Sequence, residues 1–81
     1  MTRIPILMPK FNYEMESGIV QAWRCRTGEH VNKDVVVVEI EGEKASVDVV
    51  APASGSLVEI VHEAGDEVPV GRAIGWIETE G

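Results

Sequence analysis

The sequence predicts an all-β domain, built as a flattened antiparallel barrel or sandwich of two four-stranded sheets with internal pseudo-twofold symmetry. Two observations favour strands: valine and isoleucine dominate the apolar residues, and they fall in short runs bounded by Gly, Pro, Asp or Ser. A third observation predicts the symmetry, because the chain repeats its own pattern after about half its length. The core is expected to be small, since a chain of 81 residues buries only about 60 to 65 % of its surface.

An offset of 37 residues aligns the first half of the chain with the second. The residues that coincide are Ser17-Gly18 with Ser54-Gly55, Gly28 with Gly65, Val31 with Val68, and Ile40-Glu41 with Ile77-Glu78. In each half a Ser-Gly turn leads into an apolar strand, a glycine turn and a second apolar strand. Two units are too few for a solenoid, which needs about three, so we expect two sheets to close on one shared core.

Eight short strands are expected in order along the chain. They span residues 4–8, 18–25, 30–32, 35–41, 45–50, 55–60, 67–69 and 73–78. The turns between them carry Gly, Pro, Asp or Ser, which adopt the backbone conformations that turns require. No linker interrupts the series, so one domain is predicted over residues 1–79, with residues 80–81 beginning a linker.

Charge and hydropathy argue against several classes of protein. The net charge is −7, with 7 Lys and Arg against 14 Asp and Glu, which argues against nucleic acid as a partner. No run of about 18 apolar residues is long enough to span a membrane, and the first residues lead directly into an apolar strand without a signal or transit peptide. We expect a cytoplasmic location in a bacterium or archaeon, with the mitochondrial matrix as the alternative, and a domain that is monomeric in isolation.

Lys44 is the candidate for chemistry, because the hairpin predicted over residues 39–47 places it at the tip. In the 37-residue offset it matches Gly81, which puts it at the end of the long axis. Acylation of its amine would remove the charge and extend a flexible arm into solvent. The plainer interpretation is a solvated lysine that protects a sheet edge from aggregation, and the residues alone leave both open. Glu39, Glu41 and Glu43 alternate along this hairpin and are expected to form an acidic face beside it.

A series of ordered motifs extends over residues 4–77. They are Met8-Pro9-Lys10, Glu16-Ser17-Gly18-Ile19-Val20, Gly28-Glu29 with Val31, Glu39-Ile40-Glu41, Glu43-Lys44-Ala45, Ala51-Pro52-Ala53-Ser54-Gly55 and residues 63–71. On these residues the chain resembles the lipoyl domains of the acyltransferase (E2) components of 2-oxo acid dehydrogenase complexes, within the biotinyl/lipoyl carrier family. The resemblance implies the lipoyl/biotinyl-carrier fold.

The same resemblance implies that Lys44 carries lipoic acid in amide linkage, and that Glu43 and Ala45 on either side contribute to recognition by the lipoylating enzyme. The family most often has aspartate in place of Glu43 and threonine in place of Gly42. A biotin carrier domain is the alternative within the fold, but its lysine is typically flanked by methionines. Neither neighbour of Lys44 is methionine, which favours lipoate over biotin.

The function implied by the resemblance is that of a carrier domain and not of an enzyme. A lipoyl-lysine arm accepts an acyl group from a thiamine-dependent decarboxylase (E1), presents it to the E2 acyltransferase core for transfer to coenzyme A, and is reoxidised by dihydrolipoamide dehydrogenase (E3). Pyruvate, 2-oxoglutarate, branched-chain 2-oxo acid and acetoin systems use similar domains. The motif Met8-Pro9-Lys10 leans slightly toward a pyruvate or acetoin system.

The segment over residues 9–16 follows the first strand and, by the resemblance, lies beside the modified hairpin. It holds Phe11 and Tyr13, two of the four aromatic residues of the chain. We expect Asn12, Tyr13 and Glu14 to be recognised by the decarboxylase. Phe11 and Met15 are expected to close the end of the barrel.

The other chemically distinctive residues have structural interpretations. Cys25 has no second cysteine and no fixed histidine base, and is expected as a strand thiol. His30 and His62 lie far apart in the sequence and are expected as solvated or hydrogen-bonded strand residues, with no metal bound. Trp23 and Trp76 are expected to fill the core or cover its rim.

Two further classes of protein compete with the carrier. An unmodified interaction module of the same fold is disfavoured by the intact Glu43-Lys44-Ala45. An independent enzyme is disfavoured because the sequence has no paired nucleophile and base, no metal-ligand cluster and no glycine-rich phosphate loop.

Overall fold

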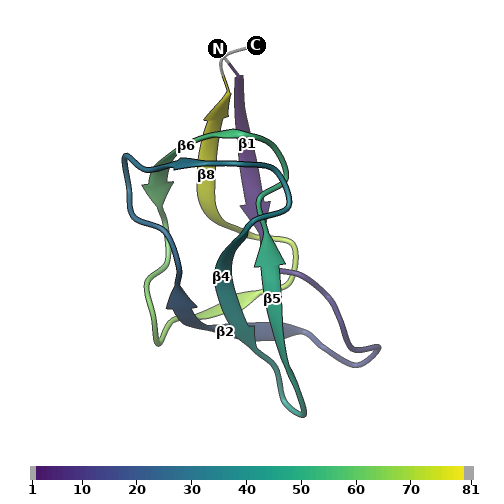
Figure 1. The fold of residues 1–81 in the computed structure, drawn as a ribbon. Helices are drawn as coiled ribbons and strands as arrows, with labels where there is room; N and C mark the ends of the chain where they lie inside the picture. The colour runs from purple at the N-terminus through teal and green to yellow at the C-terminus, as the bar shows by residue number, and fades with distance from the viewer. Residues whose placement is uncertain (1, 80–81) are drawn as a thin grey trace.

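Eight antiparallel strands form two sheets in the computed structural model, which describes residues 2–79. The strands are β1 (Thr2–Leu7), β2 (Ser17–Trp23), β3 (His30–Val31), β4 (Val36–Glu41), β5 (Ser46–Val50), β6 (Gly55–Ile60), β7 (Glu67–Pro69) and β8 (Ala73–Thr79). One sheet has the order β1-β8-β6-β3 and the other β5-β4-β2-β7, which confirms the predicted fold class (Figure 1). Over residues 2–79 there is no helix with the length and apolarity needed to cross a bilayer.

The observed strand ends differ from the predicted ones by at most two residues. The strand predicted over residues 18–25 ends at Trp23, so Cys25 lies in the bend that follows and not on a strand. Val35 lies before β4, because its N–H closes a turn with the carbonyl three residues back (3.1 Å). Ala45 lies before β5, because its carbonyl accepts the N–H of Gly42 and closes the hairpin. The predicted start of a linker, residues 80–81, lies outside the described residues.

The pseudo-twofold symmetry appears in both the strand order and the hydrogen bonds. Exchanging β1 with β5, β2 with β6, β3 with β7 and β4 with β8 converts one sheet's order into the other's. The N–H of Gly28 donates to the carbonyl of Leu57 (2.7 Å), and the N–H of Gly65 donates to the carbonyl of Val20 (2.8 Å). These two bonds are related by the 37-residue offset, and each joins a turn of one half to a strand of the other. The halves therefore interlock.

The turns also repeat in backbone conformation. Gly28 and Gly65 have φ of 94° and 99°, and the next equivalent pair, Asp34 and Gly71, has φ of 74° and 88°. Glycine adopts this left-handed conformation without a Cβ clash, and aspartate is one of the few other residues that tolerate it. The symmetry of the fold therefore dictates the conformation at residue 34 even where the side chain is not glycine.

The core lies between the two sheets and is entirely apolar in the described chain. Its members come from both sheets and from the segments that join them: Ile6, Met8, Met15, Val20, Cys25, Val31, Val37, Val38, Ile40, Ala51, Leu57, Val68, Ile74 and Ile77. Trp23 packs against this cluster, and its Nε1–H donates to the carbonyl of His62 (2.8 Å). The expectation that Trp23 covers the rim is confirmed, and Trp76 is half-buried.

Gly55 is expected to be intolerant of a side chain. An ideal Cβ at this position would approach the backbone carbonyl of Glu78, and would lie 2.9 Å from Cγ2 of Ile77. Because backbone atoms of a paired strand yield little, Gly55→Ala should lower the free energy of unfolding by about 1 to 3 kcal/mol. Urea unfolding measures this, with Ser56→Ala as the adjacent control expected within about 0.5 kcal/mol of wild type. Equal stability of the two variants would contradict the close approach.

Candidate functional site

Lys44 lies at the tip of the hairpin that joins β4 to β5. The N–H of Gly42 donates to the carbonyl of Ala45 (2.7 Å), which leaves Glu43 and Lys44 as the two exposed tip residues. Neither has a positive φ, so any L-residue fits there without backbone strain. Over residues 2–79 the side chain of Lys44 makes no hydrogen bond and no ion pair. Its amine is therefore directed into solvent and available for modification.

The hairpin tip lies at one end of the molecule and the ends of the described chain lie at the other. The domain measures 36 Å along its long axis and 20 × 18 Å across it. Thr2 pairs with Thr79 at the end opposite the β4–β5 hairpin (Figure 1). An arm attached at Lys44 would therefore extend away from the paired residues Thr2 and Thr79.

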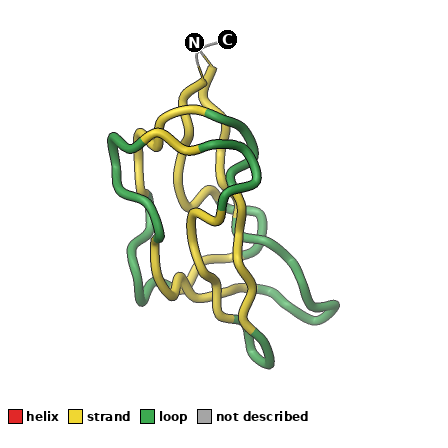
Figure 2. The backbone as a smooth tube through the Cα atoms, in the orientation of Figure 1, coloured by secondary structure: helices red, strands yellow, loops and turns green. Residues whose placement is uncertain are grey.

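A second loop lies at the same end of the molecule as the hairpin. This β1–β2 loop, residues 8–16, is the longest loop in the tube view (Figure 2). The side chain of Asn12 accepts the N–H of Glu14 (3.0 Å), and its carbonyl accepts the N–H of Met15 (3.0 Å), which folds the loop into a tight turn. Met15 is buried and Phe11 packs against the core, as predicted, whereas Tyr13 is 95% exposed. The turn thus presents Tyr13 to solvent.

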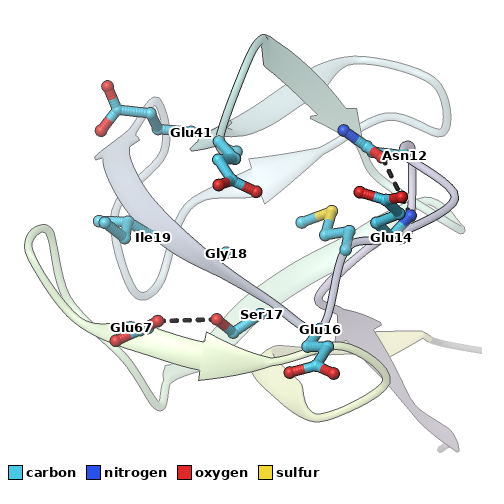
Figure 3. A pocket seen from close by; sticks show the side chains of 11 residues that line it. Asn12, Glu14, Glu16, Ser17, Gly18, Ile19, Glu41 and Glu67 are labelled. Carbon is cyan, nitrogen blue, oxygen red and sulfur yellow. Dashed lines mark hydrogen bonds between the residues drawn. The ribbon is translucent and has the colours of Figure 1, made fainter.

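A groove of about 350 Å³ lies between the β1–β2 loop and the hairpin. Its lining includes no Lys or Arg, but it includes five glutamates: Glu14, Glu16, Glu41, Glu43 and Glu67. Figure 3 shows Asn12 and Glu14 on one side of the groove and Glu41 on another, with Glu67 accepting a hydrogen bond from the hydroxyl of Ser17 (2.7 Å). The surface beside Lys44 is therefore strongly negative.

The structure corrects the acidic face predicted along the hairpin. Glu41 and Glu43 line the groove, but Glu39 does not, because its carboxylate pairs with the guanidinium of Arg24, the residue after β2. Glu16 and Glu67 belong to the groove and were not predicted there. Glu67 reaches it because β7 pairs with β2, a long-range neighbour that sequence spacing does not reveal.

The other candidate residues lie away from this site. His30 is on the short strand β3, and His62 has its Nδ1 3.4 Å from a carboxylate oxygen of Asp66. Over residues 2–79 no three His, Cys, Asp or Glu side chains come together as metal ligands. Burial raises the pKa of the Cys25 thiol above its ordinary value of 9.0, and the negative charge of Glu29 adds to the shift. A raised pKa makes Cys25 an unreactive thiol at neutral pH.

Comparison with known proteins agrees with this geometry. The family model described as "Biotin-requiring enzyme", the biotinyl/lipoyl family, matches residues 4–77. The chain is 35% identical over 74 residues to the dihydrolipoyllysine-residue acetyltransferase component of the acetoin cleaving system of Bacillus subtilis. It is 38% identical over 78 residues to the dihydrolipoyllysine-residue succinyltransferase component of the 2-oxoglutarate dehydrogenase complex of Azotobacter vinelandii. These matches cover 91% and 96% of this chain but 19% of each relative, so the chain spans about a fifth of their length.

A solved structure matches over almost its whole length. The solution structure of the lipoyl domain of the 2-oxoglutarate dehydrogenase complex from Azotobacter vinelandii superposes with a TM-score of 0.79 at 36% identity. The match covers 96% of this chain and 99% of that one. The two chains therefore share one domain from end to end.

The chain belongs to the biotinyl/lipoyl family of small β-sandwich carrier domains. Within that family it is a lipoyl carrier domain of the kind found in the E2 acyltransferase components of 2-oxo acid dehydrogenase complexes. The biotin alternative is less supported, because the relatives named above are lipoyl proteins.

The raised pKa of Cys25 predicts a pH-dependent stability. The folded domain holds the thiol proton more tightly than the unfolded chain, so its stabilising contribution is complete below pH 9.0 and is lost as the pH rises through the higher folded pKa. Urea unfolding of wild type and Cys25→Ala, from neutral pH to about pH 11, measures the difference. The free energy of unfolding should fall more steeply with alkaline pH in wild type. Parallel curves for the two proteins would refute the assignment.

Proposed function

We propose that Lys44 is the lipoyl attachment site and that the domain acts as a non-catalytic acyl carrier of a 2-oxo acid dehydrogenase complex. The observation that carries the proposal is the position of Lys44, which is exposed at a hairpin tip on the long axis and opposite the paired residues Thr2 and Thr79. The intact Glu43-Lys44-Ala45 and the lipoyl relatives support it.

The residues at the tip fit a lysine-linked lipoyl group. Amide formation on Lys44 removes a charge that no described neighbour pairs with, so modification breaks no ion pair. When bound, lipoate supplies a dithiolane that carries an acyl group and two electrons. The chain itself holds the attachment nitrogen at the turn closed by Gly42 and Ala45, and keeps it outside the apolar core.

The separation between the hairpin and the chain ends supports the carrier role. An arm at one end of a 36 Å domain, with the polypeptide leaving from the other, can visit several active sites while the domain stays attached. Attachment raises the effective concentration of the arm at each active site, so no free diffusion between enzymes is needed. The partners we propose are the E1 decarboxylase, the E2 acyltransferase core, the E3 dehydrogenase and the lipoylating enzyme.

Recognition by E1 is proposed for Asn12, Tyr13 and Glu14. The turn closed by Asn12 exposes almost the whole ring of Tyr13, and its neighbours Asn12 and Glu14 line one groove with Gly42 and Glu43 of the lysine hairpin. An exposed tyrosine is the kind of side chain that dominates binding when a partner buries it. Glu43 and Ala45 are proposed as the contacts of the lipoylating enzyme, and the bacterial or archaeal cytoplasm as the location, with the mitochondrial matrix as the alternative.

Lipoylation is expected at Lys44 and at no other lysine. Intact-protein and peptide mass spectrometry after incubation with lipoate, ATP and a lipoate ligase should show one lipoyl increment on the peptide that contains Lys44. Lys44→Arg should remove the increment, and Lys33→Arg, the same change on another exposed lysine, should retain it. A folded domain that stays unmodified beside a modified reference lipoyl domain would refute the proposal.

Tyr13→Ala is expected to weaken the reaction with E1 without affecting the fold. Because the side chain is 95% exposed, its loss should leave the unfolding midpoint unchanged. The kcat/KM for reductive acylation of the lipoylated domain should fall about tenfold, the equivalent of ~1.4 kcal/mol. Val61→Ala, at a surface position 40% exposed, is the control and should match wild type. An unchanged rate for Tyr13→Ala would remove Tyr13 from the recognition surface.

A further inference from the structure

The β1–β2 loop and the lysine hairpin are joined by side-chain packing and not by hydrogen bonds. Over residues 2–79, no hydrogen bond or ion pair connects residues 9–16 to residues 42–45. The loop bonds within its own turn, and the carbonyl of Glu16 accepts the N–H of Val70. The hairpin bonds within itself, from Gly42 to Ala45. Beyond the β2–β4 ladder, in which Ile19 pairs with Glu41, the loop is therefore held against the hairpin tip by packing.

That contact is the ring of Phe11 against Gly42. An ideal Cβ on Gly42 would lie 2.6 Å from Cζ and 2.8 Å from Cε2 of Phe11, so the ring occupies the space that any side chain at residue 42 would take. Phe11 in turn packs against the buried core, which gives the contact a rigid support. The aromatic side chain thus connects the core, the loop and the hairpin tip.

The reason for glycine at residue 42 differs from that at the turns. Gly28, Gly65 and Gly71 have positive φ and open space around them, so they are glycine because of backbone conformation. Gly42 has no positive φ, but a Cβ there would displace the ring of Phe11, so close approach and not backbone conformation favours glycine at this position. Phe11 and Gly42 are therefore a matched pair.

We propose that Phe11 and Gly42 are positioning residues that hold the β1–β2 loop against the hairpin, so that the decarboxylase meets Tyr13 and lipoylated Lys44 at a fixed separation. This inference rests on the carrier function proposed above. A docking surface made of two loops is recognised well only when the loops keep one relative position, because a misplacement of about 1 Å can cost up to about a hundredfold in rate.

Three variants test the contact. Phe11→Leu withdraws the ring from the hairpin, and Gly42→Ala introduces a Cβ into the ring's space. The double variant Phe11→Leu/Gly42→Ala restores the fit, because the shorter leucine leaves room for the new methyl group. Ile60→Val, at a half-buried core contact on the other sheet, controls for a general loss of stability.

The first measurement uses the unmodified domain and does not depend on its function. Backbone ¹⁵N order parameters should fall at residues 43–45 and 12–14 in both single variants and recover in the double variant, while Ile60→Val leaves them as in wild type. Order parameters at residues 43–45 that are unchanged in Phe11→Leu, or losses that simply add in the double variant, would overturn the matched pair.

The second measurement uses the lipoylated domain. Decarboxylases of acetoin, pyruvate and 2-oxoglutarate systems are tried with wild type, and the one that acylates it fastest is kept. The KM for the domain should rise about tenfold in each single variant with kcat within about twofold, and should recover to within about threefold in the double variant. An unchanged KM in both single variants overturns the positioning role. A wild-type domain that is never lipoylated or acylated instead refutes the carrier function, and the order parameters still decide the contact.

Discussion

The whole structure depends on the reciprocal hydrogen bonds between its two halves. The turn at Gly28 is bound by the strand that contains Leu57, and the turn at Gly65 by the strand that contains Val20. Leu57 and Val20 are both completely buried, so each bond ties an exposed turn of one half to a core-forming strand of the other. A chain of this size has too little apolar surface to stabilise each half alone. Interlocking gives both halves one shared core, and the domain is expected to unfold as a single cooperative unit.

The pseudo-twofold symmetry determines where the lysine hairpin lies. The one large departure from that symmetry is the β1–β2 loop, which lies beside the hairpin. The symmetry exchanges β4 with β8 and β5 with β1. The hairpin that joins β4 to β5 is therefore equivalent to the place where the start of β1 meets the end of β8, and the two lie at opposite ends of the molecule (Figure 1). Met8 and Ala51 occupy equivalent positions, since each donates its N–H to a turn carbonyl 2.9 Å away. Residues 9–16 then follow in the first half, but only residues 52–53 in the second. The additional residues form the loop that packs on the hairpin.

Charge and packing have separate effects at this end of the domain. Five glutamates line the groove beside Lys44 and none of its lining residues is basic, so the surface that a partner enzyme approaches is negative. Such a field changes the rate of encounter more than the affinity. The apolar contact of Phe11 with Gly42 lies at the same end of the domain, and it determines the shape of this surface and not its charge. Recognition of the loop and delivery of the arm therefore occur on one small, pre-organised surface.

The sequence by itself determined the all-β class, the two-fold repeat, the bounds of all eight strands to within two residues at each end, and Lys44 as a hairpin tip. Hydrophobic alternation, turn residues and the 37-residue offset are local or periodic signals that can be read from a single sequence. The sequence predicts Cys25 as a strand thiol, whereas the structure places it two residues beyond the end of β2. Only the tertiary structure decided that Glu67 lines the acidic groove and that Glu39 forms an ion pair with Arg24. It also decided that Gly42 lies against the ring of Phe11. Each of these depends on which distant strands pair and in which register, and no local pattern records that choice.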